Sequence, residues 1–231
     1  MMPGHGFCSH GRGKFRKEGA DMWNYEKRLQ YPIRITTPNA KLAQYIISQY
    51  GGPDGEINAS LRYLSQRFTM PNRKIAGLLT DIGTEELAHL EMVSTIVHQL
   101  TADLSMEEIE KSGFGNYYID HTTGVWAQAA GGVPQNACQF QSKGDPITDL
   151  FEDLAAESKA RSTYDNILRV VKDMPEIADP IRFLREREIV HFQRFGEALR
   201  MMQEELDSRN FYAFNPAFDQ PVICTCADNN N

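Results

Sequence analysis

Residues 84–92 have the sequence TEELAHLEM, and residues 185–193 have the sequence REREIVHFQ. Each segment contains a Glu-x-x-His motif, at Glu86 and His89 and again at Glu188 and His191. Residues three apart lie on one face of a helix, so each pair can reach a single ion. A single match is weak, because about 0.5 matches are expected by chance in such a chain. Two matches, each inside a helical pattern, indicate a metal site more strongly.

Both motifs lie in apolar seams with helical spacing. A helix is predicted from about residue 73 to residue 100, and a second from about Pro180 onward. The first seam contains Ile75, Leu79, Ile82, Val93, Ile96 and Leu100, and the second contains Ile181, Leu184, Phe195, Ala198 and Met202. The two motifs occupy the positions between these apolar residues, in steps of three and four. The sequence therefore predicts that both Glu-x-x-His pairs are buried.

Two further helices follow from the same periodicity. One spans about residues 38–68 and is interrupted by GGPDG at residues 51–55, immediately before Glu56. The other begins at Pro146, with Asp145 as its cap, and ends near Lys172. The apolar stripe of this helix comprises Ile147, Leu150, Leu154, position 157, Arg161, Tyr164, Leu168 and Val171. Four long amphipathic helices predict an all-α four-helix bundle.

The buried carboxylates need a positive partner. An ionised carboxylate buried alone costs several kcal/mol, and four of them exceed the typical net stability of a domain, about 5–15 kcal/mol. Arg161 shares a stripe with Glu157 and could pair with it, but one arginine cannot serve four carboxylates. A pair of cations can, and carboxylate oxygen with imidazole nitrogen suits manganese or iron. The predicted ligand candidates are Glu56, Glu86, His89, Glu157, Glu188 and His191.

The two halves of the chain repeat one pattern. Glu56 precedes Glu86 by 30 residues, and Glu157 precedes Glu188 by 31. A tyrosine follows each lone glutamate by seven residues, at Tyr63 and Tyr164. One Glu from each of two helices and Glu-x-x-His from each of the other two is the pattern of ferritin-like dimetal bundles. We therefore expect a ferritin-like four-helix bundle with a dinuclear metal site.

The remaining sequence defines the expected organisation. Residues 101–144 form a long crossover between the second and third helices, with a capping box from Ser105 to Glu108 and the turn GGVP at residues 131–134. His121 and Trp126 lie in this connector, where they could line an entry channel or simply pack as a covering loop. We expect a mobile arm at residues 1–22, a catalytic domain at residues 23–205 and a tail at residues 206–231.

Charge and cysteine content narrow the class of protein. The chain of 231 residues has a formal charge of −7 and a pI near 5.4, and its Lys and Arg are scattered, so no nucleic-acid partner is expected. No apolar run suits a membrane span or a secretion signal. Cys8, Cys138, Cys224 and Cys226 match neither a disulfide framework nor paired zinc-binding motifs, so we expect free thiols.

Several segments taken together resemble the manganese catalases, particularly the short spore-coat type. They are GGPDGE at residues 51–56, TEELAHLEM at residues 84–92, GDP at residues 144–146 leading to AAE at residues 155–157, REREIVHF at residues 185–192, and the opening MWNYEK at residues 22–27. The resemblance spans about residues 22–205. It implies a dimanganese catalase that disproportionates hydrogen peroxide by cycling between Mn(II) and Mn(III) pairs.

The resemblance also implies individual roles. Glu56, Glu86, His89, Glu157 and His191 would bind two manganese ions per chain, and Glu188 would stay off the metal and move protons. Tyr63 would contact the cluster through hydrogen bonds. Some members have a basic residue where this chain has Ala156 or Tyr164, and Arg161 or Lys159 could substitute. The family forms hexamers, so a homo-oligomer is expected, in the cytoplasm or with other proteins of a spore coat.

Two other functions remain open from the sequence. A di-iron ferroxidase or peroxidase would use the same ligand types, and a generic di-iron site would make Glu188 a ligand. A rubrerythrin-like peroxidase would also need a four-cysteine iron site, which Cys224 and Cys226 alone cannot build. The non-enzymatic alternative is a structural spore-coat protein that retains the metal site.

Overall fold

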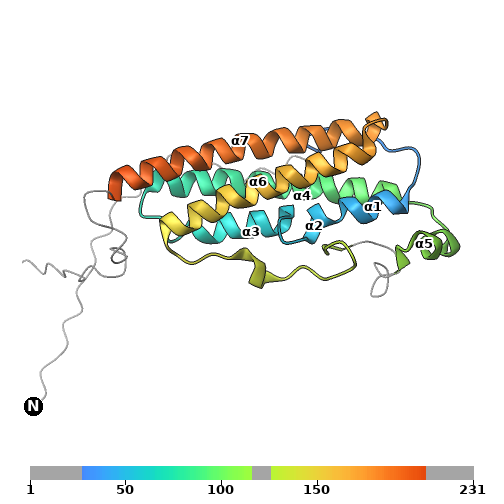
Figure 1. Ribbon diagram of the computed structural model, residues 1–231, viewed down its shortest axis with the longest axis horizontal. Helices are drawn as coiled ribbons and strands as arrows, with labels where there is room; N and C mark the ends of the chain where they lie inside the picture. The colour runs from blue at the N-terminus through green and yellow to red at the C-terminus, as the bar shows by residue number, and fades with distance from the viewer. Residues whose placement is uncertain (1–27, 116–125, 207–231) are drawn as a thin grey trace, which may run out of the picture.

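The computed structural model describes residues 28–115 and 126–206, and these residues form a bundle of long helices (Figure 1). In chain order the helices are α1 (Ala40–Ile46), α2 (Ser48–Gly51), α3 (Glu56–Gln66), α4 (Arg73–Thr101), α5 (Met106–Ser112), a 3-10 helix at Ala137–Phe140, α6 (Pro146–Val171) and α7 (Pro175–Leu206). Within the described ranges, no helix has the length and apolar character that a membrane span requires. The predicted all-α fold is confirmed.

Side-chain caps start the long helices where the sequence predicts. The Asn72 side chain accepts hydrogen bonds from the backbone N–H groups of Lys74 and Ile75 at the start of α4. Asp145 accepts from the N–H of Thr148, and Pro146 occupies the first turn of α6. These caps satisfy N–H groups that have no partner inside the helix. The start of α6 predicted from Asp145 and Pro146 is confirmed.

The glycine-rich segment at residues 51–55 separates α2 from α3 and determines where Glu56 lies. A Cβ atom on Gly51 would come within 2.3 Å of the backbone nitrogen of Gln128, so only glycine allows this close approach of the crossover. Glu56 is the first residue of α3 and is buried. The N-terminus of a helix favours a negative charge, which suits a carboxylate at this position. The break therefore directs Glu56 inward.

The fourth long helix begins earlier than predicted. The sequence suggests a start near Pro180, but α7 begins at Pro175 and contains Pro180 in its second turn. The N–H groups of Ile177 and Ala178 both bond to the carbonyl of Met174, which secures the first turn. Pro180 has no backbone N–H, so α7 lacks the hydrogen bond that this position would otherwise donate to the carbonyl of Glu176. The α6–α7 connection is consequently a tight turn.

The apolar face of α6 also differs from the predicted stripe. Leu154, Arg161 and Leu168 are only partly buried. The other predicted positions, Ile147, Leu150, Glu157, Tyr164 and Val171, are buried as expected. The buried face also includes Asp149, Asp153, Ala156, Ala160 and Ile167, which are mostly small or acidic residues that a search for large apolar side chains does not select.

The bundle consists of two helical hairpins with a polar layer between two apolar clusters. The hairpin α3–α4 packs against the hairpin α6–α7, and α1 and α2 continue the line of α3 along α4 (Figure 1). One apolar cluster includes Val93, Ile96, Leu100, Ile181 and Leu184, and the other includes Leu79, Ile82, Leu150, Phe195 and Met202. The two Glu-x-x-His motifs fall between these clusters along α4 and α7.

The connector between α4 and α6 returns along the outside of the bundle, as predicted (Figure 1). The capping box at Ser105 and Glu108 starts α5. Gly131 and Gly132 have φ angles of 89° and 80°, and the Ala129 N–H bonds to the Val133 carbonyl, which forms the predicted turn. His121, Cys8, Cys224, Cys226 and both expected terminal segments lie largely or wholly outside the described residues. Cys138 is an exposed free thiol.

Candidate metal centre

Six predicted ligand candidates meet at the centre of the bundle. Each is at most 2% exposed, although each carries a carboxylate or an imidazole. Four helices supply them: Glu56 from α3, Glu86 and His89 from α4, Glu157 from α6, and Glu188 and His191 from α7. The structure therefore brings together every residue that the sequence proposed for metal binding.

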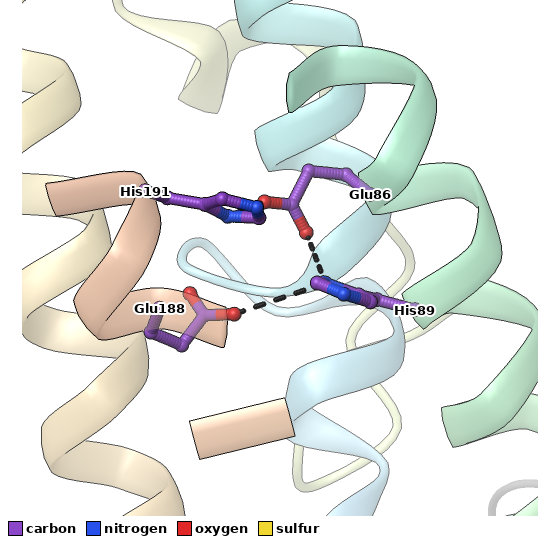
Figure 2. A group of neighbouring side chains, drawn as sticks. All are labelled: Glu86, His89, Glu188 and His191. Carbon is purple, nitrogen blue, oxygen red and sulfur yellow. Dashed lines mark hydrogen bonds and ion pairs between the residues drawn. The ribbon is translucent and has the colours of Figure 1, made fainter. Parts of the chain in front are cut away.

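The two Glu-x-x-His motifs form the middle of this cluster (Figure 2). One ligand atom each from Glu86, His89, Glu188 and His191 can be chosen so that all four atoms lie within 4.8 Å of one another. Glu86 lies between the two imidazoles: Oε2 is 2.8 Å from His89 Nδ1, and Oε1 is 2.7 Å from His191 Nδ1. Glu188 Oε1 lies 3.8 Å from His89 Nδ1. Both histidines thus direct Nδ1 toward the carboxylates.

The two lone glutamates approach different histidines of this group. Glu56 Oε2 is 3.7 Å from His89 Nδ1, and Glu157 Oε2 is 3.6 Å from His191 Nδ1. Each lone glutamate therefore lies near the histidine from its own half of the chain: Glu56 near His89, and Glu157 near His191. The repeat seen in the sequence corresponds to a near-symmetric arrangement of donor atoms.

Two buried tyrosines connect the halves of the chain. The Tyr63 hydroxyl donates a 2.5 Å hydrogen bond to Glu157, and the Tyr164 hydroxyl donates to Glu56. Burial, followed by the charge of the bonded glutamate, raises the pKa of each tyrosine well above its ordinary value. Both phenols therefore remain protonated donors, and each orients a carboxylate from the other hairpin.

The protein alone compensates for its buried charges with protons. Burial and repulsion by Glu86 raise the pKa of Glu56 to about 8, and burial with repulsion by Glu157 raises the pKa of Glu188 well above its usual range. Burial would also raise the pKa of Glu86, but His89 and His191 lower it below its ordinary value. Despite burial, the charge of Glu86 raises the pKa of His191 to about 12 and that of His89 well above its usual range. These opposing pKa shifts arise because several like charges share one buried space, a cost that bound cations would relieve.

The donor atoms fit a pair of metal ions. Glu157 Oε2, Glu188 Oε1 and His89 Nε2 are buried and have no hydrogen-bond partner, and Glu86 Oε1 and His191 Nδ1 lie 2.7 Å apart without the geometry of a hydrogen bond. Buried polar atoms are normally satisfied, so a concentration of unsatisfied oxygen and nitrogen atoms requires an explanation. Carboxylate and imidazole donors together suit manganese and iron. The residues present therefore fit the metal centre that their sequence spacing predicted.

The basic residues proposed as neighbours of Glu157 do not contact it. Arg161 is partly exposed and pairs with Asp165 at 2.6 Å, and Lys159 pairs with Asp54 at 2.9 Å. The proposed pairing of Arg161 or Lys159 with Glu157 is wrong, because both side chains point to the outer surface of α6. Tyr63 supplies the donor to Glu157 instead.

One residue of the site was missed in the sequence. Glu85 Oε2 lies 3.1 Å from His191 Nε2, and its carboxylate accepts two hydrogen bonds from Arg187. Glu85 lies outside the apolar seam of α4, which is why the search for seam positions overlooked it. The signal that could have found it is its spacing of four from His89, which Arg187 repeats with His191.

Comparison with known proteins identifies relatives that are similar in sequence and in fold. The family model described as "Manganese containing catalase" matches residues 22–221. Protein CotJC of Bacillus subtilis is 52% identical over 83% of this chain and 100% of its own length. A probable manganese catalase of Clostridium acetobutylicum is 30% identical over 82% of this chain and 85% of its own. The crystal structure of KatB, a manganese catalase from Anabaena PCC7120, covers 81% of this chain and 80% of its own with a TM-score of 0.67 and 29% identity.

Proposed function

Because this chain belongs to the manganese-containing catalase family, we propose that it disproportionates hydrogen peroxide to water and dioxygen at a dimanganese centre. The observation that carries this proposal is the buried cluster of four glutamates and two histidines whose oxygen and nitrogen atoms lack sufficient partners. A cluster of this charge is costly in a protein core unless cations balance it.

Five residues would hold the two manganese ions: Glu56, Glu86, His89, Glu157 and His191. The bound pair would store and return the two electrons of the reaction by alternating between divalent and trivalent states. Glu86 lies between both histidines, which supports a role for its carboxylate between the two metal positions. The tyrosine hydrogen bonds to Glu56 and Glu157 would keep these two carboxylates oriented toward the centre.

Glu188 would serve as the general acid and base. Burial, together with the neighbouring glutamates, raises the pKa of this carboxyl, which favours a group that takes up and returns a proton within the site. It would accept a proton from one peroxide molecule and donate a proton to the hydroxide that leaves when another peroxide is reduced. Oxidation of one peroxide to dioxygen releases two protons and two electrons, and reduction of another to two water molecules takes up the same two protons and two electrons; Glu188 would transfer these protons one at a time.

Two observations each favour an alternative function. Glu188 Oε1 lies 3.8 Å from His89 Nδ1, about as close as Glu56 Oε2 at 3.7 Å, and a di-iron ferroxidase or peroxidase would use Glu188 as a sixth ligand. The resemblance to the short spore-coat members supports a structural role in a coat that retains the metal site. On the same resemblance, we propose a homo-oligomer located in the spore coat.

Elemental analysis followed by oxygen evolution tests the proposed function. We expect two manganese ions per chain and rapid release of dioxygen from hydrogen peroxide. Glu188→Gln should retain both manganese ions and lose at least about 100-fold in rate, a typical contribution of a general acid or base. Absence of dioxygen from fully metallated wild-type protein would contradict the catalase proposal. Preferential iron uptake with ferrous oxidation would favour the ferroxidase alternative.

A further inference from the structure

Glu85 contacts the outer side of the candidate metal centre. It lies on α4 immediately before Glu86, and its side chain points toward α7. One face of the carboxylate accepts hydrogen bonds from Arg187 Nε at 2.7 Å and from its Nη2 at 3.1 Å. The same carboxylate also lies beside the two histidines: Oε2 is 3.1 Å from His191 Nε2, and Oε1 is 3.7 Å from His89 Nε2. A single carboxylate therefore faces both imidazoles from behind.

The orientation of the two imidazole rings gives this contact a chemical meaning. Nδ1 of each ring faces the inner carboxylates, at 2.8 Å for His89 and 2.7 Å for His191. Nε2 of each ring faces Glu85. A neutral imidazole carries one proton, and only the unprotonated nitrogen can bind a metal. A carboxylate beside Nε2 retains the proton there and leaves the Nδ1 lone pair available at the centre of the cluster.

We propose that Glu85 is a positioning residue, which fixes the ring orientation and tautomer of His191 through a hydrogen bond to its Nε2 and attracts His89 Nε2, 3.7 Å away, through its charge. This inference rests on the proposed metal centre, because it assigns both Nδ1 atoms to metal binding. Carboxylates commonly orient metal-binding histidines, usually with one carboxylate for each histidine. Here one carboxylate hydrogen-bonds the histidine of one Glu-x-x-His motif and lies within ion-pair distance of the histidine of the other.

Other contacts hold Glu85 in place. Arg187 binds it with two nitrogens and lies on α7, four residues before His191. Gln30 Nε2 donates to Glu85 Oε1 at 2.9 Å from the segment before α1. The Glu85 side chain is 17% exposed, compared with 0% for both histidines, so it lies between the dry centre and solvent. Two-nitrogen pairing with arginine restricts the carboxylate more than a single contact does.

Asp81 provides a matched control, because Glu85 could also act simply by joining α4 to α7 through an ion pair. Like Glu85, it lies on α4 and pairs with an arginine of α7, Arg194, at 2.9 Å. Its side chain is 68% exposed. Asp81→Asn therefore removes an α4–α7 ion pair on the surface, whereas Glu85→Gln and Glu85→Leu alter a pair that also faces the histidines.

Manganese affinity, measured by competition with a chelator, is the first test. We expect Glu85→Leu to weaken manganese binding by about 10- to 100-fold, the usual effect of losing such an orienting partner. Glu85→Gln should weaken it less, because its amide oxygen can still accept one hydrogen bond. Asp81→Asn should stay within about twofold of wild type, a surface pair being worth about 1 kcal/mol or less to the fold.

Crystal structures of the metal-free variants supply a second test that needs no metal binding. In wild type and Asp81→Asn we expect ordered imidazole rings with Nε2 toward Glu85. In Glu85→Leu we expect the His191 ring to be rotated or to adopt more than one orientation. Unchanged rings in Glu85→Leu, or equal manganese affinity in all variants, would overturn the positioning role. If wild type binds two manganese ions with the expected dependence on Glu85 but releases no dioxygen, the catalase proposal fails and the positioning role stands.

Discussion

The hydroxyl of Tyr63 donates a 2.5 Å hydrogen bond to the carboxylate of Glu157, a residue 94 positions later in the chain. Tyr164 and Glu56 form the reciprocal pair, with the tyrosine now in the second half and the glutamate in the first. Each half of the molecule thus orients a carboxylate that the other half supplies. This exchange could not follow from the seven-residue spacing within each half.

Tyr63→Phe should weaken manganese binding and lower the rate of oxygen evolution. Phenylalanine retains the ring packed against Phe195 but removes the donor to Glu157, which becomes free to turn. We expect a loss of about tenfold in affinity, by analogy with other orienting partners. Titration with manganese measures it. Tyr45→Phe, at an exposed position of α1, is the control, and equal losses in both variants would contradict the prediction.

Tyr164→Phe should produce a loss of similar size, because its bond to Glu56 mirrors the Tyr63 bond. Manganese affinity should fall, and the helix content should change little. Chelator competition and circular dichroism measure the two quantities. Wild-type affinity in Tyr164→Phe would show that Glu56 needs no donor, and the reciprocal arrangement would then have no functional value.

Removal of manganese should lower the melting temperature. A ligand at 100 times its Kd stabilises a fold by about 2.7 kcal/mol. For a chain of this size each kcal/mol shifts the melting temperature by about 2–4 °C. Calorimetry with and without manganese measures the shift. The double variant His89→Ala, His191→Ala should lose it, and persistence of the shift in this variant would place manganese elsewhere.

Gly83→Ala should destabilise the bundle, whereas Gly77→Ala on the same helix should stabilise it. A Cβ atom at Gly83 would lie 2.9 Å from Leu64 Cγ and 3.3 Å from the Leu64 backbone nitrogen, so α3 and α4 would be forced apart. Overpacking typically costs about 1–3 kcal/mol. Nothing lies within 4 Å of a Cβ at Gly77, where the higher helix propensity of alanine should add about 1 kcal/mol. Urea unfolding measures both changes, and equal signs would contradict the prediction.

Asp153→Asn should flatten the pH dependence of stability in the metal-free protein. Burial raises the pKa of Asp153 well above its ordinary value, with smaller raising contributions from Glu157 and Asp149, against the lowering effects of Gln66 and Arg62. The folded state therefore retains a proton that the unfolded state releases once the pH exceeds about 4. Stability consequently falls as the pH rises from that value through the raised pKa.

Because asparagine cannot ionise, the free energy of unfolding of Asp153→Asn should rise relative to that of wild type as the pH increases. We expect the difference in unfolding free energy between the two proteins to grow by more than about 1 kcal/mol from pH 5 to pH 8. Urea titrations at both pH values measure it, with Asp81→Asn as the exposed control. Parallel profiles for wild type and Asp153→Asn would contradict a protonated Asp153.

The sequence predicted the fold and the six ligand candidates because charged residues interrupt apolar seams of helical spacing. Glu86 and His89 between Ile82 and Val93 are such an interruption, and burial makes it meaningful. On α6 the same method found Glu157 but missed part of the buried face, because Asp153 and Ala160 face the core while Leu154 and Arg161 are partly exposed. A face of small and acidic residues carries no apolar signal, so its orientation depends on tertiary packing.

The contacts around the ligands were less predictable for a related reason. Spacing along one helix determines which residues share a face, but not which residue of another helix lies opposite. The pairing of Glu85 with Arg187, and of Tyr63 with Glu157, depends on the register of α4 against α7 and of α3 against α6. Arg161 was assigned to the wrong carboxylate for the same reason.

The division of the core into two apolar clusters has a consequence for access. Both ends of the bundle axis are closed by side chains such as Leu100 and Leu184 on one side and Leu79 and Met202 on the other. A small polar reactant must therefore diffuse to the centre sideways, between neighbouring helices. The α4–α7 side is one such direction, since Glu85 both reaches solvent and contacts His191.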